Sequence, residues 1–446
     1  RDGRLMPVSC RYYDVRRVTG EVTQVDVDNG RVEQAGTSFF DKAVIRVLGD
    51  KGWGVFSVSG EEAEFENLPE SLIKEAYSAS LVTNIHIPIQ ETPSRIHAVP
   101  SMKENPADVN LEEKVSILLD MYKATEGPNI VSRRINYIEK DEKVTFSDCY
   151  GHSYNYGICR CGFSVLSVAS RAGIVQMGYE RDHTISGLNI RHRQDLAREA
   201  TERAGRLLNA KPAKGGILRA VLDPELAGVF AHEAVGHASE GDLVKEGSSI
   251  LKGKIDEQIG SPLLTIVDDP SLPEFGFCPV DDEGTETKRT GIIQKGILKS
   301  YLHSKETLAS VGFGDAGHCR GMPGVEPIVR MSNTFIENGD SSYDEIISEC
   351  RSGILLKGSR GGQVDPGRGM FQFNAEFGYL IEDGECTTMV RDVSLSGEIL
   401  QTLHTISLIG DDLALHPGYC GKGGQTVPVT DGSPHLLLDK AVVGGC

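Results

Sequence analysis

The feature that most constrains the fold is a short strand leading directly into a capped helix that bears two histidines. Residues 217–222 are mostly apolar, as in a buried strand. Asp223-Pro224-Glu225 follows and supplies an N-cap, a first-turn proline and an acidic first turn. The helix that begins there carries His232-Glu233-Ala-Val-Gly-His237. The chain must therefore fold so that a strand and a helix together present this segment.

The two histidines are five residues apart, one more than in the zinc-peptidase signature His-Glu-x-x-His. In a straight α-helix this spacing leaves them about 140° apart, too divergent for easy coordination of one metal. A π-bulge or an early helix end at Gly236 would bring His237 back toward His232. Two ordinary histidines, one at the core and one in solvent, are the alternative. The His-Glu pair followed by Gly-His on a capped helix favours a metal site, with Glu233 as general base.

A third ligand has to come from another part of the chain, because a catalytic zinc takes three protein ligands and keeps one position open. Cys420 lies among glycines in residues 417–425, where the backbone can turn and present a thiolate. His416 and Cys319, beside His318, are competing ligands. The spacing alone leaves these alternatives open.

Cys149, His152, Cys159 and Cys161 form a second compact group with ligand chemistry. Their spacing fits no standard zinc pair. Side chains two apart in a strand share a face, so we interpret Cys159 and Cys161 as part of a hairpin that fills a core. The ten cysteines are scattered through a large chain, which predicts mostly reduced, buried thiols.

The coarse pattern predicts an α+β fold in two domains, residues 1–210 with mixed strands and helices and residues 211–446 with a strand-rich, metal-binding region. Residues 209–216 are the linker candidate. Strands are expected at 22–32, 43–48, 53–58, 144–146, 163–169, 217–222, 292–298 and 379–389, with turns at Asn29-Gly30, 49–52, 294–296 and Asp383-Gly384. Helices are expected around 111–122, with a capping-box-like start at Asn110 and Glu113, around 196–207 and at 343–351.

The composition excludes some classes of function. The net charge is −18, which disfavours binding to nucleic acid. No apolar stretch approaches the roughly 20 residues of a membrane helix. No secretory leader pattern opens the chain, so we expect a cytoplasmic location. The glycine-rich run 358–369 could suggest phosphate binding, but turns or close backbone approach explain it better.

Several segments together resemble the TldD/PmbA family of metallopeptidases, in its motif-bearing TldD branch. The N-terminal part contributes Asp14-Val15-Arg16-Arg17 and the stretch from Arg46-Val47 to Gly52-Trp53-Gly54. The C-terminal half contributes more specific segments: Ala231 to His237 with Glu240-Gly241-Asp242, Asp281-Asp-Glu-Gly-Thr285, Arg330-Met-Ser-Asn-Thr334, Gly361-Gly-Gln-Val-Asp365 and Cys420 to Val429.

The resemblance implies a zinc ion (Zn2+) held by His232, His237 and Cys420, with Glu233 activating the water. It also implies a peptidase acting on unfolded or extended peptides, in a complex with a motif-less TldE/PmbA-like paralogue or as a homodimer. Glu240 and Asp242 are candidates for supporting the ligands or capping a helix. A non-catalytic zinc-containing modulator and a metal-dependent amidase for small molecules are the rival hypotheses.

Overall fold

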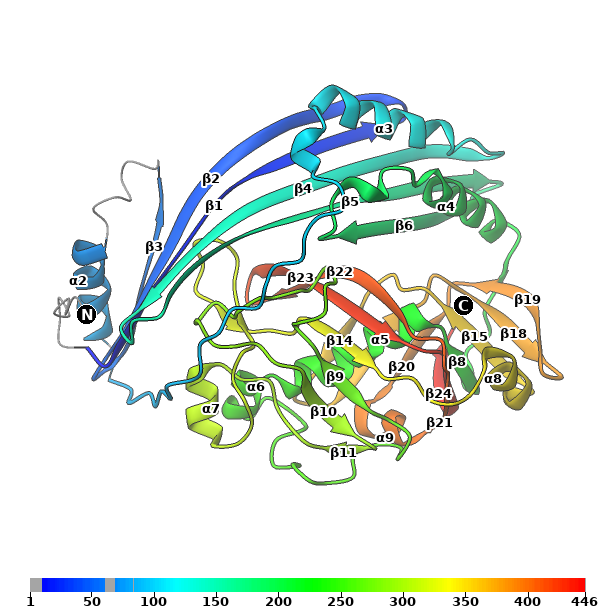
Figure 1. Cartoon of the computed structure of the whole chain (residues 1–446). Coiled ribbons are helices and arrows are strands. Elements are labelled where there is room, and N and C mark those ends of the chain that lie inside the picture. The colour runs from blue at the N-terminus through cyan, green and yellow to red at the C-terminus, as the bar shows by residue number, and fades with distance from the viewer. Residues whose placement is uncertain (1–9, 61–68, 83, 446) are drawn as a thin grey trace.

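The protein is a two-layered molecule, described here from a computed structural model over residues 10–60, 69–82 and 84–445. A long, arched antiparallel sheet lies above a C-terminal half of shorter strands and helices (Figure 1). This arrangement confirms the α+β class. The upper sheet has the strand order β3-β2-β1-β4-β5-β6. Its strands are β1 (Tyr12–Asp28), β2 (Arg31–Gly49), β3 (Gly52–Ser59), β4 (Ile130–Asp148), β5 (Ser153–Arg171) and β6 (Ile174–Thr184).

The strands of the upper sheet are much longer than the sequence pattern predicts. The predicted turn at Asn29-Gly30 joins β1 to β2, with both residues at positive φ (48° and 80°). The predicted runs 144–146 and 163–169, however, are only parts of β4 and β5, which span 19 residues each. Most of residues 31–39 in β2 are exposed. The first part of β2 therefore lacks the buried apolar alternation that would predict its full length.

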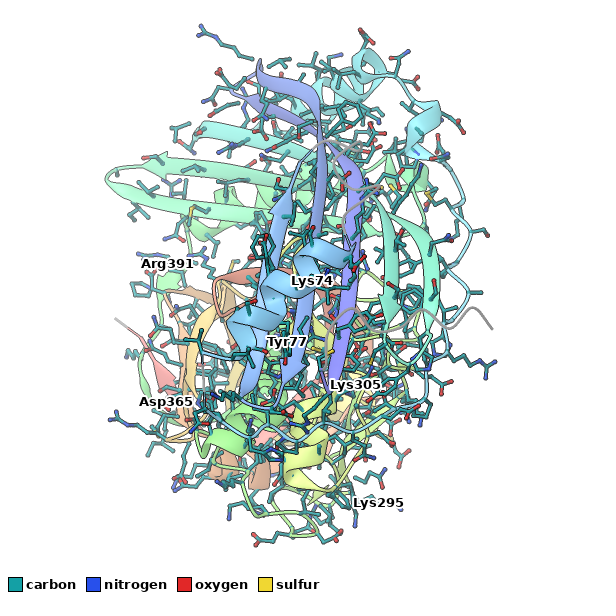
Figure 2. The ribbon with its side chains drawn as sticks, turned by 90° about the vertical axis from the view of Figure 1, so that its left-hand side faces the viewer. Lys74, Tyr77, Lys295, Lys305, Asp365 and Arg391 are labelled. Carbon is teal, nitrogen blue, oxygen red and sulfur yellow. The ribbon has the colours of Figure 1, made fainter. Side chains whose placement is uncertain are left out.

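Three helices pack on the upper sheet: α2 (Pro69–Ser80), α3 (Leu111–Lys123) and α4 (Gln194–Leu207). Helices α3 and α4 lie on the upper face in Figure 1. The side chain of Asn110 accepts a hydrogen bond from the Glu113 backbone N–H at 2.8 Å, which confirms the predicted start of α3. Helix α2, which the sequence pattern did not reveal, crosses the other end of the sheet and carries Lys74 and Tyr77 (Figure 2).

The C-terminal half contains two larger sheets, of order β11-β10-β9-β14-β23-β22 and β16-β17-β20-β24-β8-β15-β18-β19-β7. One continuous apolar core joins residues of both sheets to the histidine-bearing helix. The strands are β7 (Lys211–Pro212), β8 (Gly216–Leu222), β9 (Ile266–Asp268), β10 (Thr290–Gln294), β11 (Ile297–Leu298), β12 (Cys319–Arg320), β13 (Ile328–Val329), β14 (Asn333–Ile336), β15 (Gly353–Lys357), β16 (Gly362–Asp365), β17 (Met370–Asn374), β18 (Phe377–Glu382), β19 (Glu385–Arg391), β20 (Ser394–Glu398), β21 (Ile406–Ile409), β22 (Ala414–Lys422), β23 (Gln425–Ser433) and β24 (Leu436–Gly444). The helices are α5 (Pro224–Phe230), α6 (Gly241–Glu246), α7 (Lys305–Val311), α8 (Tyr343–Cys350) and α9 (Ile399–His404).

Local predictions hold well in this half. The hairpins β10–β11 and β18–β19 turn where predicted, and α8 matches the helix predicted at 343–351. Six described cysteines are buried (Cys159, Cys161, Cys278, Cys319, Cys350 and Cys420) whereas Cys386 is exposed; Cys446 lies outside the described residues. The domain division at residue 210 stays a prediction.

Buried ion pairs join the upper sheet to the C-terminal half. Arg46 pairs with Asp14 of the neighbouring strand and, at 3.0 Å, with Glu283. Arg16 pairs with Asp282 at 2.8 Å. Lys305, labelled in Figure 2, is fully buried and donates to the Glu283 carbonyl oxygen at 2.7 Å. Within the described residues, no helix is long and apolar enough to cross a membrane.

Candidate metal centre

The histidine-bearing helix begins as the sequence predicts and then changes its winding. The Asp223 carboxylate caps α5 by accepting the Leu226 N–H at 3.0 Å. The helix continues from Phe230 into a π-helical turn, Ala231–Gly236, in which the His237 N–H donates to the His232 carbonyl oxygen. Such an i→i+5 bond stacks residues that are five apart. The predicted π-bulge is therefore the device that brings the two histidines together.

Close backbone packing holds this turn in place. A Cβ atom added at Gly236 would lie 1.9 Å from Sδ of the buried Met331. One at Gly228 would lie 2.8 Å from the backbone nitrogen of Gly432 in β23. Glycine lets the helix approach where any side chain would obstruct it. The π-helical turn thus packs closely against Met331, and the preceding helix α5 packs closely against β23.

The side chains of His232, His237 and Cys420 converge on one point. Their potential ligand atoms all lie within 4.8 Å of one another. Nε2 of His237 is 3.6 Å from Sγ of Cys420, and the two imidazole rings are 5.2 Å apart between centroids. All three residues are buried. Two imidazoles and a thiolate are a donor set that suits zinc, so these residues fit the expected ion.

Each histidine has a carboxylate beside the nitrogen that faces away from this group. Nδ1 of His232 lies 2.6 Å from Oδ1 of Asp431. Nδ1 of His237 lies 2.9 Å from Oε2 of Glu240. A carboxylate in this position fixes the ring orientation and raises the basicity of the other nitrogen. Glu240 is completely buried, which supports the expectation that it orients a ligand.

The electrostatics of the group favour a thiolate. Burial alone would raise the pKa of Cys420, but the charges and hydrogen bonds of His232 and His237 lower it to about 5. Burial alone would lower the pKa of His237, but Glu240 and Cys420 raise it to about 10. The thiolate is the form that binds metals.

Glu233 projects toward an adjoining cavity of about 440 Å³. Its side chain is 29 % exposed, and Oε2 lies 3.9 Å from Nε2 of His237. Burial raises the pKa of this carboxyl above its ordinary value, and the charges of the two histidines oppose that shift. The cavity is lined by Ser164, Tyr179, Arg181, His183, Val229, His232, Glu233, Ser359, Gly361, Gly418, Tyr419 and Asp431. It therefore lies between the upper sheet and the C-terminal half.

The competing ligands lie elsewhere. His416 lines a neighbouring cavity. Cys319 packs beside the Asp281–Glu283 carboxylates, and burial is the main cause of its raised pKa. Cys161 lies in the core beneath α3, which confirms the hairpin interpretation. Among the described residues, only His232, His237 and Cys420 form a metal-ligand group.

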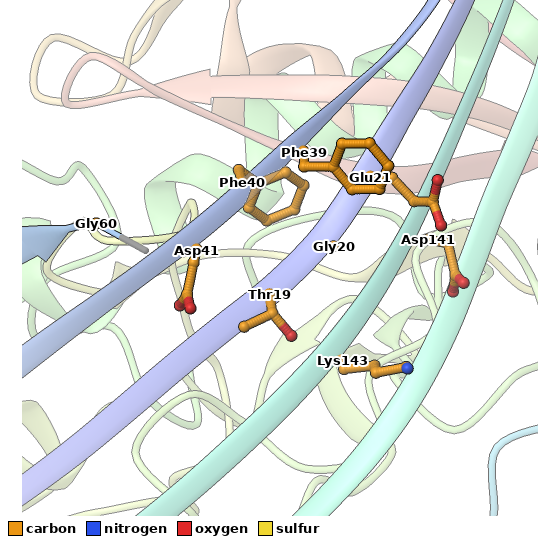
Figure 3. A pocket seen from close by; sticks show the side chains of 9 residues that line it. All are labelled: Thr19, Gly20, Glu21, Phe39, Phe40, Asp41, Gly60, Asp141 and Lys143. Carbon is orange, nitrogen blue, oxygen red and sulfur yellow. The ribbon is translucent and has the colours of Figure 1, made fainter. Parts of the chain in front are cut away.

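The outer face of the upper sheet has a larger cavity, of about 510 Å³ (Figure 3). Phe39, Phe40 and Asp41 of β2 line it together with Thr19 to Glu21 of β1. None of its lining residues belongs to the metal group. It is therefore unrelated to the candidate centre.

Some residues of the site were not identified from the sequence. Tyr179, Arg181 and His183 alternate along β6 and line the cavity. Their alternation was a usable signal, but nothing in the sequence placed β6 above the helix. Asp431 is likewise missed, because its role depends on the pairing of β23 with β22. The glycine-rich run contributes Ser359 and Gly361 to the wall, as turns in close approach rather than as a phosphate loop.

Two histidines on a helix and a cysteine on a strand, able to hold a metal beside a carboxylate and a cavity, are the arrangement of a metal-dependent hydrolase. Three family models match the chain: PmbA/TldA metallopeptidase domain 1 over residues 13–80, the central domain over 104–208 and the C-terminal domain over 215–445. The chain belongs to this PmbA/TldD metallopeptidase family.

Similar proteins cover nearly the whole chain. A metalloprotease of Archaeoglobus fulgidus is 40 % identical over 98 % of this chain and 100 % of its own length. A zinc metalloprotease TldD homolog of Saccharolobus solfataricus is 30 % identical over 90 % of this chain and 89 % of its own. The structure of TldE from Thermococcus kodakarensis shares the fold at 20 % identity, with a TM-score of 0.78 and coverage of 98 % and 97 %.

Proposed function

We propose that the chain is a zinc-dependent peptidase in which His232, His237 and Cys420 hold the metal and Glu233 is the general base. The observation that carries this proposal is the convergence of the three ligand atoms within 4.8 Å, beside a carboxylate that lines a cavity. The name of the Saccharolobus relative, a zinc metalloprotease, supports the choice of metal.

The residues of the chain divide the work of peptide hydrolysis. A zinc ion held here would supply a Lewis acid for the scissile carbonyl and would acidify a water molecule. Glu233 accepts the proton from the attacking water at its carboxylate and returns it to the leaving amine. Its raised pKa brings it closer to the value that suits such a shuttle. Glu240 and Asp431 hold the two ligand imidazoles in orientation.

We propose unfolded or extended peptides as substrates. Cys420 lies on β22, which is the edge strand of its sheet. Strand β6, which supplies the roof of the cavity, is also an edge strand. An extended peptide can add to such an edge through backbone hydrogen bonds that tolerate many sequences. Comparable cleavage rates for a tightly folded protein and a short unstructured peptide would argue against this substrate class.

Assembly is part of the proposal. A motif-less TldE-like paralogue is the expected partner, since a chain named TldE shares this fold; a homodimer is the alternative. A light-scattering mass equal to that of one chain in a fully active preparation would exclude both.

The presence of Glu233 in the cavity wall favours catalysis over a purely structural zinc site, which needs no base.

The test of the catalytic role is Glu233→Gln, which keeps the side-chain volume and removes the base. Zinc content should stay at the wild-type level while hydrolysis of an unstructured peptide falls by about 10²–10⁴-fold. Glu246→Gln, on the exposed face of α6, is the matched control. Wild-type turnover in Glu233→Gln would show that this residue is not the base. If the preferred substrates are small amides rather than peptides, the amidase alternative replaces the peptidase.

A further inference from the structure

His183 is the one histidine of the upper sheet that lines the metal-site cavity. It lies near the end of β6, opposite Gly162 of β5 in the strand register. A Cβ atom at Gly162 would lie 2.3 Å from Cδ2 and 2.5 Å from Cγ of the imidazole. The ring therefore lies across Gly162, in a space that no other residue type would leave open.

Two aromatic rings of the C-terminal half fix the other sides of this imidazole. Phe275 lies 5.3 Å from it between centroids, and Tyr419, the residue before Cys420, lies 6.0 Å away with its ring nearly perpendicular. Phe275 and Tyr419 also contact each other edge to face. These two rings hold His183 in one orientation beside β22, the strand that bears Cys420.

One nitrogen of His183 has no protein partner in the described part of the chain. Nδ1 is buried and has no hydrogen-bond partner among the described residues. A buried N–H without a partner is rarer and more costly than an unpaired acceptor, so the proton belongs on Nε2. Burial, with a smaller effect from Arg181, lowers the pKa of this imidazole to about 4. The ring is therefore a neutral Nε2–H donor at physiological pH.

Such a donor in a cavity next to a metal centre has a clear chemical use. We propose that His183 contacts the substrate and donates a hydrogen bond from Nε2 to the carbonyl oxygen of the scissile peptide bond. This inference rests on the proposed peptidase function. As negative charge develops on that oxygen in the transition state, a preorientated donor stabilises it without reorganisation. The upper sheet thereby supplies a catalytic residue to a centre whose ligands all come from the C-terminal half.

His183→Phe tests this role, because phenylalanine keeps a ring on Gly162 and between its aromatic neighbours. The turnover number should fall about 10²–10³-fold, as for the loss of one oxyanion donor, with KM, zinc content and melting temperature little changed. His183→Gln, which restores a donor, should recover part of the loss. His192→Phe, at an exposed histidine nearby, is the control and should match wild type.

A binding measurement separates this role from a structural one. A phosphinic peptide, which mimics the tetrahedral transition state, should bind zinc-loaded His183→Phe more weakly by the factor lost in kcat/KM. The corresponding ordinary peptide should bind the Glu233→Gln protein equally well with and without His183→Phe. Unchanged affinity for the phosphinic peptide, or a loss of zinc in His183→Phe, would overturn the inference.

The two proposals can fail separately. If zinc-loaded wild type hydrolyses no peptide, the proposed function fails. Weaker binding of the phosphinic peptide by His183→Phe than by wild type would then still support a contact between His183 and the ligand. Equal binding by His183→Phe and wild type would rule that contact out.

Discussion

Glu240 is the clearest example of a residue that acts through another side chain, the imidazole of His237. Its carboxylate is completely buried, contacts Nδ1 of His237 and forms an ion pair with Lys422 at 3.0 Å. Burial would raise its pKa, but His237 and Lys422 outweigh that effect and lower it. The charge is therefore retained, and the ring of His237 is held with Nε2 toward Cys420.

Replacing this charge should weaken metal binding without removing a ligand. We expect Glu240→Gln to reduce zinc affinity about 10–100-fold, as is typical for residues that orient a ligand. Competition with a fluorescent zinc chelator measures it. Glu246→Gln, exposed on α6, should bind zinc as wild type does. Equal affinities for the two variants would show that the His237–Glu240 contact does not support the metal.

At the scale of single residues, the sequence predicts the residues of the His-Glu motif better than it predicts the residues that surround them. His232, Glu233 and His237 follow from one motif, and the structure brings Cys420 to them. Spacing alone could not choose Cys420 over His416, since both lie on the same face of β22 and the choice depends on which part of the strand meets the helix. Asp431 and His183 were not predicted because their roles arise from strand pairing and from the stacking of two layers.

The π-helical turn is the element that makes a five-residue spacing work. It exists between an α-helix capped by Asp223 and a short 3₁₀ turn at His237–Ser239. Gly236 lies where the turn contacts Met331, and it leaves room for the Met331 side chain. The geometry of the candidate metal centre therefore depends on a contact that involves none of its three proposed ligands.

Gly236→Ala should strain this element. The added methyl would lie 1.9 Å from Sδ of Met331, and overpacking of this kind costs about 1–3 kcal/mol. Calorimetry should show a lower melting temperature, together with weaker zinc binding. Gly205→Ala is the matched control, since its Cβ meets nothing within 4 Å inside α4 and should be neutral or slightly stabilising. Shortening the Met331 side chain in the double variant Gly236→Ala/Met331→Ala should restore part of the zinc affinity. A Gly236→Ala protein with wild-type stability and zinc binding would contradict this account.

Elements with local signals were predicted well, and those defined by tertiary contacts were not. The cap at Asp223, the turn at Asn29-Gly30 and the helix after Asn110 depend on neighbouring residues and match the structure. The full lengths of β2, β4 and β5 depend on pairing across the upper sheet. The exposed first part of β2, residues 31–39, has little buried apolar alternation from which its length could be predicted.

At the scale of the whole molecule, charged groups join the two layers. Arg203 of α4 is buried and pairs with Glu180 of β6 and with Glu376 of the C-terminal half. Burial raises the pKa of Glu376 from 4.5 to about 7, although Arg203 opposes the shift. Between pH 4.5 and about 7, the folded protein therefore binds a proton at Glu376 that the unfolded chain releases.

This shift makes stability depend on pH with a definite sign. Between pH 4.5 and about 7 the folded state holds more protons at Glu376 than the unfolded state, so its contribution to stability falls as pH rises. The loss should be at most about 3.4 kcal/mol, because the pKa rises from 4.5 to about 7 and each unit corresponds to 1.36 kcal/mol. Urea unfolding at several pH values should show a flatter profile for Glu376→Gln than for wild type. Exposed Glu349→Gln is the control; an unchanged slope in Glu376→Gln would place the pH dependence elsewhere.

The central claim, a zinc ion held by two imidazoles and one thiolate, is tested most directly by zinc K-edge X-ray absorption. The wild-type protein should show one sulfur at about 2.3 Å with two imidazole nitrogens at about 2.0–2.1 Å and one further light atom. Cys420→Ser should lose the sulfur shell and most of the bound zinc, because a hydroxyl is a much poorer ligand than a thiolate. A wild-type spectrum without sulfur, or a sulfur shell that persists in Cys420→Ser, would contradict the assignment.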